Sequence, residues 1–326
     1  MTTYNHERFI KQAIESVLTQ RVDFEYELVI GEDCSTDRTR ELALQLQREY
    51  PGRIRLVLPE RNLGMKSNFL RTLAACRGQY VALLEGDDYW ISSHKLQKQV
   101  DLMDAHPDYS SCFHTVRVVS EDEKKRTELY PRWASGHIFS LEDILSLNFM
   151  PTCSVMFRNH LIREFPDWWY RQELVDWPLH ILNAEHGKIG FINEVMAAYR
   201  IHAGGTWSAG DPVHRLKETI KTLQHVNAHL EFRYDRIVGS AISGCHFGLA
   251  LALARKGNAR EAGRYARKCT VEYWRYTRSS LILMILLWLV VWFPRLSRLV
   301  LSAPRILRYV LPAPKIITSS LAAEAR

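Results

Sequence analysis

The stretch "ALLEGDDYW" at residues 82–90 carries the side chains with the clearest chemical potential, because Glu85, Asp87 and Asp88 follow a short apolar run. Carboxylates placed this closely repel one another unless a cation neutralises them. Oxygen ligands without sulfur favour Mg²⁺ or Mn²⁺, and protein-bound Mg²⁺ usually also contacts substrate phosphates. A solvated turn is the alternative, but the apolar run predicts a buried strand. The stretch therefore predicts a divalent cation and a phosphate-bearing substrate.

The elements before this stretch alternate between strand and helix. Apolar runs predict strands at 27–31, 53–58 and 79–85, and helical patterns separate them. This alternation predicts an α/β fold with a mainly parallel sheet flanked by helices and right-handed connections. Ligands bind at the carboxyl ends of strands in such sheets, where both "GEDCSTD" (31–37) and "EGDDYW" (85–90) lie.

The rest of the chain divides into three patterns. A helix is predicted at 94–106, a strand at 110–119, and a further helix at "DWPLHILNAEHG", with Pro178 in its first turn. From about residue 213 only helical spacing remains, with a turn at 256–258, which predicts a helical hairpin or small bundle. We therefore predict an α/β domain at 1–210, a helical region at 211–278 and a tail at 279–326.

The tail combines apolar and basic residues. Residues 281–293 form a run of thirteen apolar residues, which is short for a membrane span, and arginines alternate with apolar residues after Pro294. Between residues 273 and 315 there are seven basic residues and no acid, which accounts for the whole net charge of +7. We expect the tail to lie on a membrane surface; a core helix of the C-terminal domain is the alternative.

The charge distribution and the start of the chain bear on partners and location. No basic stripe with interleaved aromatic residues occurs elsewhere, so a nucleic-acid partner is not expected. "MTTYNHERFI" lacks the apolar segment of a signal peptide, and the six cysteines are scattered as in reduced cytosolic proteins. We expect a cytoplasmic protein that is peripherally associated with the inner face of the cell membrane.

Four motifs in order resemble the inverting family 2 glycosyltransferases, which have the GT-A fold. The chain opens with "TTYNHERFIKQAIESVLTQ", continues with "ELVIGEDCSTDRT" and "NLGMKSNFLRTLAACRGQYVALLEGDDYW", and ends the match with "ELVDWPLH" and "AAYRIHAGGTWS". The resemblance covers about residues 1–208. It implies a nucleotide-sugar donor and a Mn²⁺ or Mg²⁺ cofactor.

The resemblance implies roles for the donor-side residues. Thr3 and Tyr4 would lie against the base of the nucleotide, although core packing is an alternative for Tyr4. Glu32 would accept a hydrogen bond from the base, and Asp33 would help to hold the base or the ribose. Glu85 would contact the ribose or a metal-bound water.

The resemblance also implies metal-binding and acceptor-side residues. Asp87 would bind the metal, and His202 of "YRIH" would complete its coordination unless it is an ordinary loop histidine. Asp176 falls at the position of the general base, with a helix cap as its alternative. Glu173 is the competing base. Asp88 and Trp90 would belong to the acceptor cleft, where Trp90 would form a wall or touch the acceptor.

The sequence departs from the family pattern in two ways. Only a few residues precede Tyr4 where a full first strand is usual, so either a segment lies upstream or the sheet is incomplete at its nucleotide-binding edge. Glu32 and Glu85 replace aspartates, and Cys34 replaces a glycine.

Three hypotheses remain. The leading one is metal-dependent transfer of a sugar, from a UDP-sugar by preference, to a hydroxyl of a glycan or lipid-linked glycan. The second is a catalytically impaired nucleotide-binding scaffold at the membrane. A nucleotidyltransferase shares the fold class but normally needs a glycine-rich or basic phosphate loop near the N-terminus, which this sequence lacks.

Overall fold

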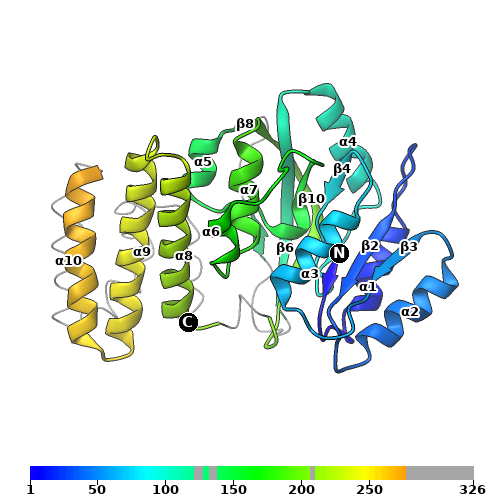
Figure 1. Ribbon diagram of the computed structural model, residues 1–326, viewed down its shortest axis with the longest axis horizontal. Coiled ribbons are helices and arrows are strands. Elements are labelled where there is room, and N and C mark those ends of the chain that lie inside the picture. The colour runs from blue at the N-terminus through cyan, green and yellow to red at the C-terminus, as the bar shows by residue number, and fades with distance from the viewer. Residues whose placement is uncertain (121–127, 132–137, 206–209, 277–326) are drawn as a thin grey trace. The chain divides into compact units, whose positions relative to one another are not determined.

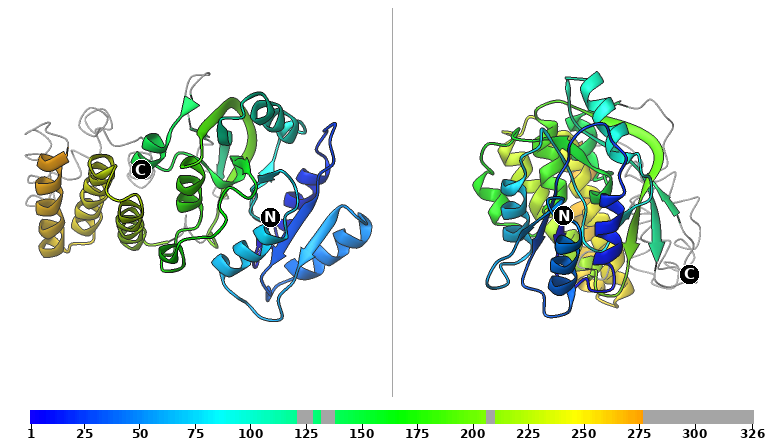
Figure 2. Two further views of the ribbon diagram at one scale, coloured as in Figure 1. Left: turned by 45° about the horizontal axis from the view of Figure 1, so that its top comes forward. Right: turned by 90° about the vertical axis from the view of Figure 1, so that its right-hand side faces the viewer.

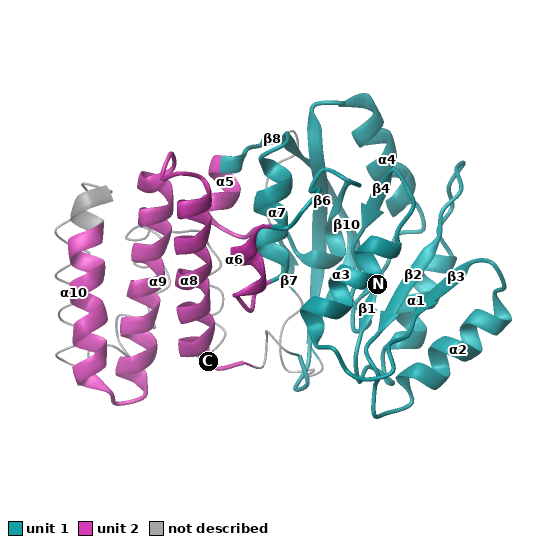
Figure 3. Cartoon of the chain, viewed as in Figure 1, with its two compact units in different colours: residues 1–141, 150–165, 175–208 teal, residues 142–149, 166–174, 209–326 magenta. Residues whose placement is uncertain are grey.

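The computed structural model of the protein describes residues 1–120, 128–131, 138–205 and 210–276 (Figure 1). The chain forms two compact units, coloured separately in Figure 3. The first unit contains Met1–Leu141, Met150–Phe165 and Val175–Ser208. The second contains Glu142–Phe149, Pro166–Leu174 and Ala209–Arg326. The predicted tail at 279–326 lies outside the described residues, and the predicted domain limits stay predictions.

The first unit begins with a parallel three-stranded sheet in the order β1-β2-β3. Apolar side chains of α1 and α2 pack with those of β2 in its core, as the alternating pattern predicted. The elements are β1 (Thr2–Thr3), α1 (Ile10–Leu18), β2 (Leu28–Glu32), α2 (Thr39–Glu49), β3 (Ile54–Val57) and α3 (Met65–Ala75).

A second sheet follows in the order β4-β9-β6-β10-β5, with β7 paired to β6 and β8 to β10. It is mixed rather than mainly parallel: β9 runs antiparallel to both of its neighbours, whereas β6 and β10 are parallel. The strands are β4 (Tyr80–Ala82), β5 (Tyr89–Trp90), β6 (Tyr109–Ser120), β7 (Glu128–Tyr130), β8 (Ile138–Phe139), β9 (Met156–Arg158) and β10 (Lys188–Ile201).

A parallel bridge between Thr2 and Glu85 joins the two sheets. The Thr2 amide donates to the Leu84 carbonyl at 3.3 Å, and the Gly86 amide donates to the Thr2 carbonyl at 2.9 Å. The short β1 therefore lies between β2 and the end of β4, and the carboxyl ends of these strands meet at one edge. Three further elements complete the first unit: α4 (Lys95–Ala105), η1 (Thr152–Ser154) and α7 (Asp176–Ala184).

The described part of the second unit is helical, as the sequence predicted. In this part, the long helices α8 (Pro212–His229), α9 (Asp235–Arg255) and α10 (Ala259–Tyr276) run side by side (Figures 1 and 2). The predicted turn at 256–258 separates α9 from α10, and Gly257 adopts a positive φ of 77° there. Two short helices, α5 (Leu141–Ser146) and α6 (Asp167–Tyr170), precede them.

Helix α9 has the composition of a membrane span. It is the one helix in the described part of the chain that is long and apolar enough to cross a bilayer, but 67% of its apolar window is buried by the protein. The core helices of soluble proteins have the same property, so α9 is weak evidence for a span.

Cys34, which replaces the usual glycine, lies in a backbone conformation that suits glycine. Cys34 has a φ of 59°, in the left-handed region that favours glycine, and its thiol contacts the Glu60 carbonyl oxygen at 3.7 Å. A side chain in this conformation is disfavoured, and a β-branched one most of all.

We therefore expect Cys34→Gly to unfold at a higher temperature than Cys34→Val, with a difference of about 1–2 kcal/mol in the free energy of unfolding. Urea denaturation of the two variants measures this difference. Equal stabilities would show that the loop after β2 relaxes around any side chain.

Candidate active site

The acidic cluster lies where β4 ends beside β1. Oxygen atoms of Glu85, Asp87 and Asp88 all lie within 4.8 Å of one another. Burial, followed by repulsion from Asp87, raises the pKa of Glu85 and of Asp88 well above the usual range. The backbone amide of Arg200 donates to Asp88 Oδ1 at 2.8 Å. A divalent cation would remove the repulsion that these carboxylates otherwise impose on one another.

Gly86 allows β1 to approach this cluster. A Cβ atom at residue 86 would lie 2.4 Å from Thr3 Oγ1 and 2.9 Å from His6 Nδ1, closer than real Cβ contacts. The glycine of "EGDD" therefore lets the first strand and the acidic residues pack directly against each other.

Two imidazoles converge on Asp87. His202 Nε2 lies 3.0 Å from Asp87 Oδ2, and His6 Nε2 lies 3.8 Å from the same oxygen. Thr3 Oγ1 is 3.2 Å from His6 Nδ1 and so orients the His6 ring. Burial, only partly opposed by the Asp87 charge, lowers the pKa of His6 and favours the neutral form that can bind a metal.

Arg200 supports the cluster from the end of β10. Its guanidinium lies 4.9 Å from the centroid of the Phe9 ring and 4.5 Å from that of Tyr89, and it donates to the Asp87 carbonyl oxygen and to Gln12. His6, Arg200 and Gln12 were not predicted from the sequence as site residues. The signals that could have found them were the position of Arg200 inside "YRIH" and that of His6 directly after "TTYN".

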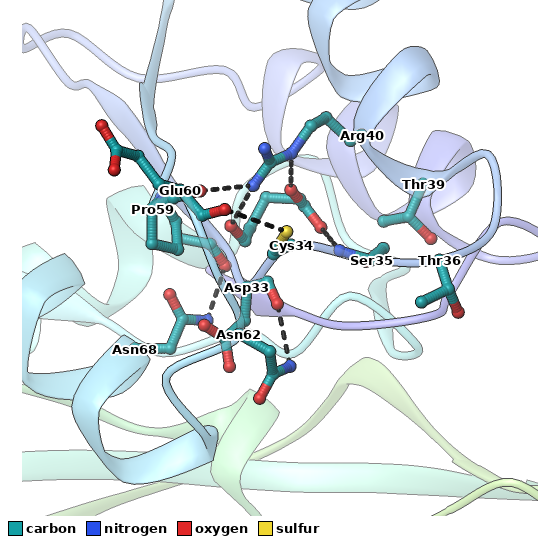
Figure 4. A network of polar contacts seen from close by, with 12 residues as sticks. Asp33, Cys34, Ser35, Thr36, Thr39, Arg40, Pro59, Glu60, Asn62 and Asn68 are labelled. Carbon is teal, nitrogen blue, oxygen red and sulfur yellow. Dashed lines mark hydrogen bonds and ion pairs between the residues drawn. The ribbon is translucent and has the colours of Figure 1, made fainter.

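The loop after β2 is held by a polar network (Figure 4). The Asp33 carboxylate accepts hydrogen bonds from the amides of Leu63 and Gly64 at 2.9 and 2.8 Å. The Asn62 side chain donates to the Asp33 carbonyl oxygen at 2.9 Å. Asp33 thus ties the end of β2 to the start of α3.

Glu32 is fully buried, and both of its carboxylate oxygens have protein partners. Oε1 accepts from the Ser35 amide at 2.6 Å, and Oε2 pairs with Arg40, which also donates to the Pro59 carbonyl oxygen at 3.1 Å (Figure 4). The extra methylene of glutamate reaches Arg40. This arrangement favours a structural role, and the predicted contact with a base stays a prediction.

The other donor-side residues differ in exposure. Thr3 is 3% exposed and contributes its hydroxyl to His6, whereas the Tyr4 side chain is 42% exposed just after β1. This exposure disfavours the core-packing alternative for Tyr4 and leaves the ring accessible to a ligand.

The two candidate bases belong to different units of the chain. Asp176 is the first residue of α7, where Val175 holds the cap position, and its charge contributes to raising the pKa of Glu85. Glu173 belongs to the second unit and pairs with His214 at 2.7 Å. Asp176 therefore acts electrostatically on the acidic cluster of its own unit.

Trp90 belongs to the hydrophobic core. Its side chain is 6% exposed, its indole N–H donates to the Cys153 carbonyl oxygen at 3.1 Å, and Lys95 Nζ lies 4.1 Å from the centroid of its ring. This packing favours the structural alternative over contact with an acceptor.

The donor set fits a divalent cation of the Mn²⁺ or Mg²⁺ kind. Asp87 and His202 are in position to hold it, with Glu85 and Asp88 beside them. Carboxylate oxygens suit both ions, and an added imidazole suits Mn²⁺ better than Mg²⁺.

In the absence of divalent metal, we expect Glu85→Gln to be more stable than the wild type at neutral pH. A carboxyl with a raised pKa in the folded state destabilises the fold as the pH rises above the unfolded value of about 4.3. The difference in melting temperature should vanish near pH 4 and grow toward neutral pH. Exposed Glu25→Gln is the control and should follow the wild type; a variant that melts like the wild type at pH 7.5 would contradict this account.

His202→Ala should weaken Mn²⁺ binding by about 10- to 100-fold, because Asp87 loses its closest imidazole. Calorimetric titration of Mn²⁺ measures the loss. His214→Ala, which removes an exposed histidine of the second unit, should bind Mn²⁺ as the wild type does; equal affinities in both variants would place the metal elsewhere.

Comparison with known proteins places this geometry in a family. The sequence profile described as "Glycosyl transferase family 2" matches residues 1–165, half of the chain. The Mycobacterium tuberculosis protein Rv1520 is 39% identical over 205 residues, which are 63% of this chain and 58% of that protein. The putative teichuronic acid biosynthesis glycosyltransferase TuaG of Bacillus subtilis is 30% identical over 201 residues, 61% of this chain and 76% of TuaG.

Solved structures share the fold at low sequence identity. Residues 1–349 of S. aureus TarS in complex with UDP-GlcNAc superpose with a TM-score of 0.58 at 19% identity, over 82% of this chain and 80% of that one. The Pyrobaculum calidifontis mannosyltransferase PcManGT, in complex with GDP-Man and Mn²⁺, gives 0.58 at 13% identity over 99% and 85%. These matches confirm the predicted fold class. The chain spans 58% of the length of its mycobacterial relatives. It belongs to glycosyltransferase family 2.

Proposed function

We propose that the protein is an inverting, metal-dependent glycosyltransferase that moves a sugar from a nucleotide-sugar donor to a hydroxyl of a glycan or lipid-linked glycan. The observation that carries the proposal is the convergence of His6 and His202 on Asp87. The charge of Asp176 also contributes to raising the pKa of Glu85 in the same acidic cluster. A cation site and a separate carboxylate are the two components that this reaction requires.

The residues of the chain divide the reaction between them. Asp87 and His202 would hold the cation, which would supply positive charge to the leaving diphosphate. Tyr4 lies against the base, and Asp33 fixes the loop that borders it. Asp176, the first residue of α7, accepts the proton of the acceptor hydroxyl.

The relatives suggest the substrate class. TarS binds UDP-GlcNAc, PcManGT binds GDP-Man with Mn²⁺, and the name of TuaG refers to teichuronic acid. By this likeness, we favour a UDP-sugar as donor and an envelope glycan as acceptor. A cytoplasmic location at the inner membrane face stays a prediction from the sequence of residues 279–326.

A nucleotide-binding scaffold without turnover is the second candidate. The two-residue length of β1 (Thr2–Thr3) favours it, because a longer first strand is usual in the family that the sequence resembles. Both the glycosyltransferase and the scaffold would bind a nucleotide, but only the glycosyltransferase would turn over a nucleotide sugar.

Calorimetry with UDP, GDP and dTDP, with and without Mn²⁺, tests the donor site. We expect Mn²⁺-dependent binding of UDP that Asp87→Ala abolishes. Binding of GDP or dTDP instead would leave the proposed glycosyltransferase activity in place and change the assigned donor. Binding of no nucleotide by the wild type would refute the proposal.

We expect Asp176→Asn to lower kcat for transfer by about 10²- to 10⁴-fold while leaving the Kd for UDP unchanged, because the amide cannot accept a proton. A coupled assay of UDP release with oligosaccharide acceptors measures kcat. Glu173→Gln is the matched control and should retain activity. The reverse pattern would make Glu173 the base, and a wild type that binds UDP without releasing it from any UDP-sugar would favour the scaffold.

A further inference from the structure

Helix α10 (Ala259–Tyr276) has one face buried against its own unit. Ala262, Ala266 and Cys269 on this face are at most 2% exposed. The opposite face is exposed and carries Arg260, Arg264, Arg267, Lys268 and Val271. At 3.6 residues per turn these five residues occupy an arc of about 100°. We call this arc the basic face of α10.

The acids of the described helix point away from the basic face. Glu261 pairs with Lys217 of α8 at 3.5 Å, and Glu272 pairs with His246 of α9 at 2.6 Å. Within the side chains that the structure describes, the basic face therefore contains four cations and no acid. A helix face that contacts only water usually carries both acidic and basic residues in i,i+4 pairs. The absence of described acids from the basic face therefore favours an anionic partner.

The sequence that follows α10 favours a membrane surface as this partner. Thirteen apolar residues occupy positions 281–293, and arginines alternate with apolar residues from 295 to 308. This is the composition of segments that lie at a membrane surface. Val271, which is 68% exposed, adds an apolar side chain to the basic face itself. Single-stranded nucleic acids are bound through aromatic platforms, and the basic face has no aromatic residue among its described side chains.

We propose that the basic face of α10 is a docking surface for the anionic headgroups of a lipid bilayer. The guanidinium and ammonium groups on this face contact lipid phosphates, and Val271 enters the interface between headgroups and acyl chains. Each cation close to such a surface strengthens binding about fivefold, an effect that salt screens. This docking is independent of the proposed sugar transfer, because no residue of α10 belongs to the candidate active site.

Co-sedimentation of the full chain with vesicles tests the proposal. The vesicles contain either phosphatidylcholine alone or phosphatidylcholine with 30 mol% phosphatidylglycerol, a composition that we choose as roughly that of a moderately anionic membrane. The test variant is Arg264→Gln/Arg267→Gln/Lys268→Gln. The control variant, Arg48→Gln/Arg71→Gln/Arg163→Gln, removes three exposed cations from the first unit and so has the same net charge.

We expect the test variant to lose on the order of 100-fold in partitioning to the anionic vesicles, and the control to lose far less. Thermal melts and UDP binding like those of the wild type would show that both variants are folded. Three results would overturn the proposal: unchanged partitioning of the test variant, equal losses in both variants, or equal binding of the wild type to neutral and anionic vesicles. Loss of binding to single-stranded DNA with unchanged vesicle binding would assign the basic face to a nucleic acid instead.

Discussion

Repulsion among closely placed carboxylates is the constraint on which the first unit depends. Asp88 is buried, and Glu85 and Asp87 lie half-buried beside it. The pKa values of Glu85 and Asp88 are raised, so ionisation of either is unfavourable without a compensating cation. A fold optimised only for stability would not bring such groups together, since buried charges need partners. The site therefore suits a ligand that carries positive charge. The repulsion that destabilises the metal-free protein is relieved when a cation binds, and this relief contributes to the affinity for metal.

The short first strand connects this constraint to the fold. Thr2 pairs with Gly31 of β2 on one side and bridges Glu85 on the other. Thr3 then orients His6 toward Asp87, and Gly86 permits the close approach. Two residues of strand therefore suffice to align the loop after β2, the acidic cluster and one imidazole at a single edge. What determines the geometry of the site is the pairing of these residues on both sides, and the length of the strand matters less.

The sequence predicted the elements whose signals are local. The strand–helix alternation over residues 27–85, the helix that begins at Asp176 and the turn at 256–258 all appear where periodicity and turn residues indicated them. The mixed order of the second sheet was missed, because pairing between strands depends on tertiary contacts that periodicity does not encode. His6 was missed for the same reason: its importance arises from the bridge between β1 and the end of β4, which places it beside an acid about eighty residues away in sequence. Trp90, by contrast, was interpreted from its proximity to the acids along the chain, whereas the alternation of side chains along β5 buries it.

The two units treat charge in opposite ways. In the first, three acids are gathered in a partly buried cluster, where lower polarity strengthens their mutual repulsion and so favours a bound cation. In the second, α10 pairs its described acids with α8 and α9 and leaves its cations on the outside, where water and salt weaken each one but several act together on an extended surface. The first arrangement suits a small ion bound with defined geometry, because buried ligands are few and fixed. The second suits a laterally mobile array of phosphates, because exposed arginine and lysine side chains adapt to positions that no fixed site could anticipate. The degree of burial thus distinguishes the acidic cluster, which suits one small cation, from the basic face of α10, which suits phosphates in varied positions.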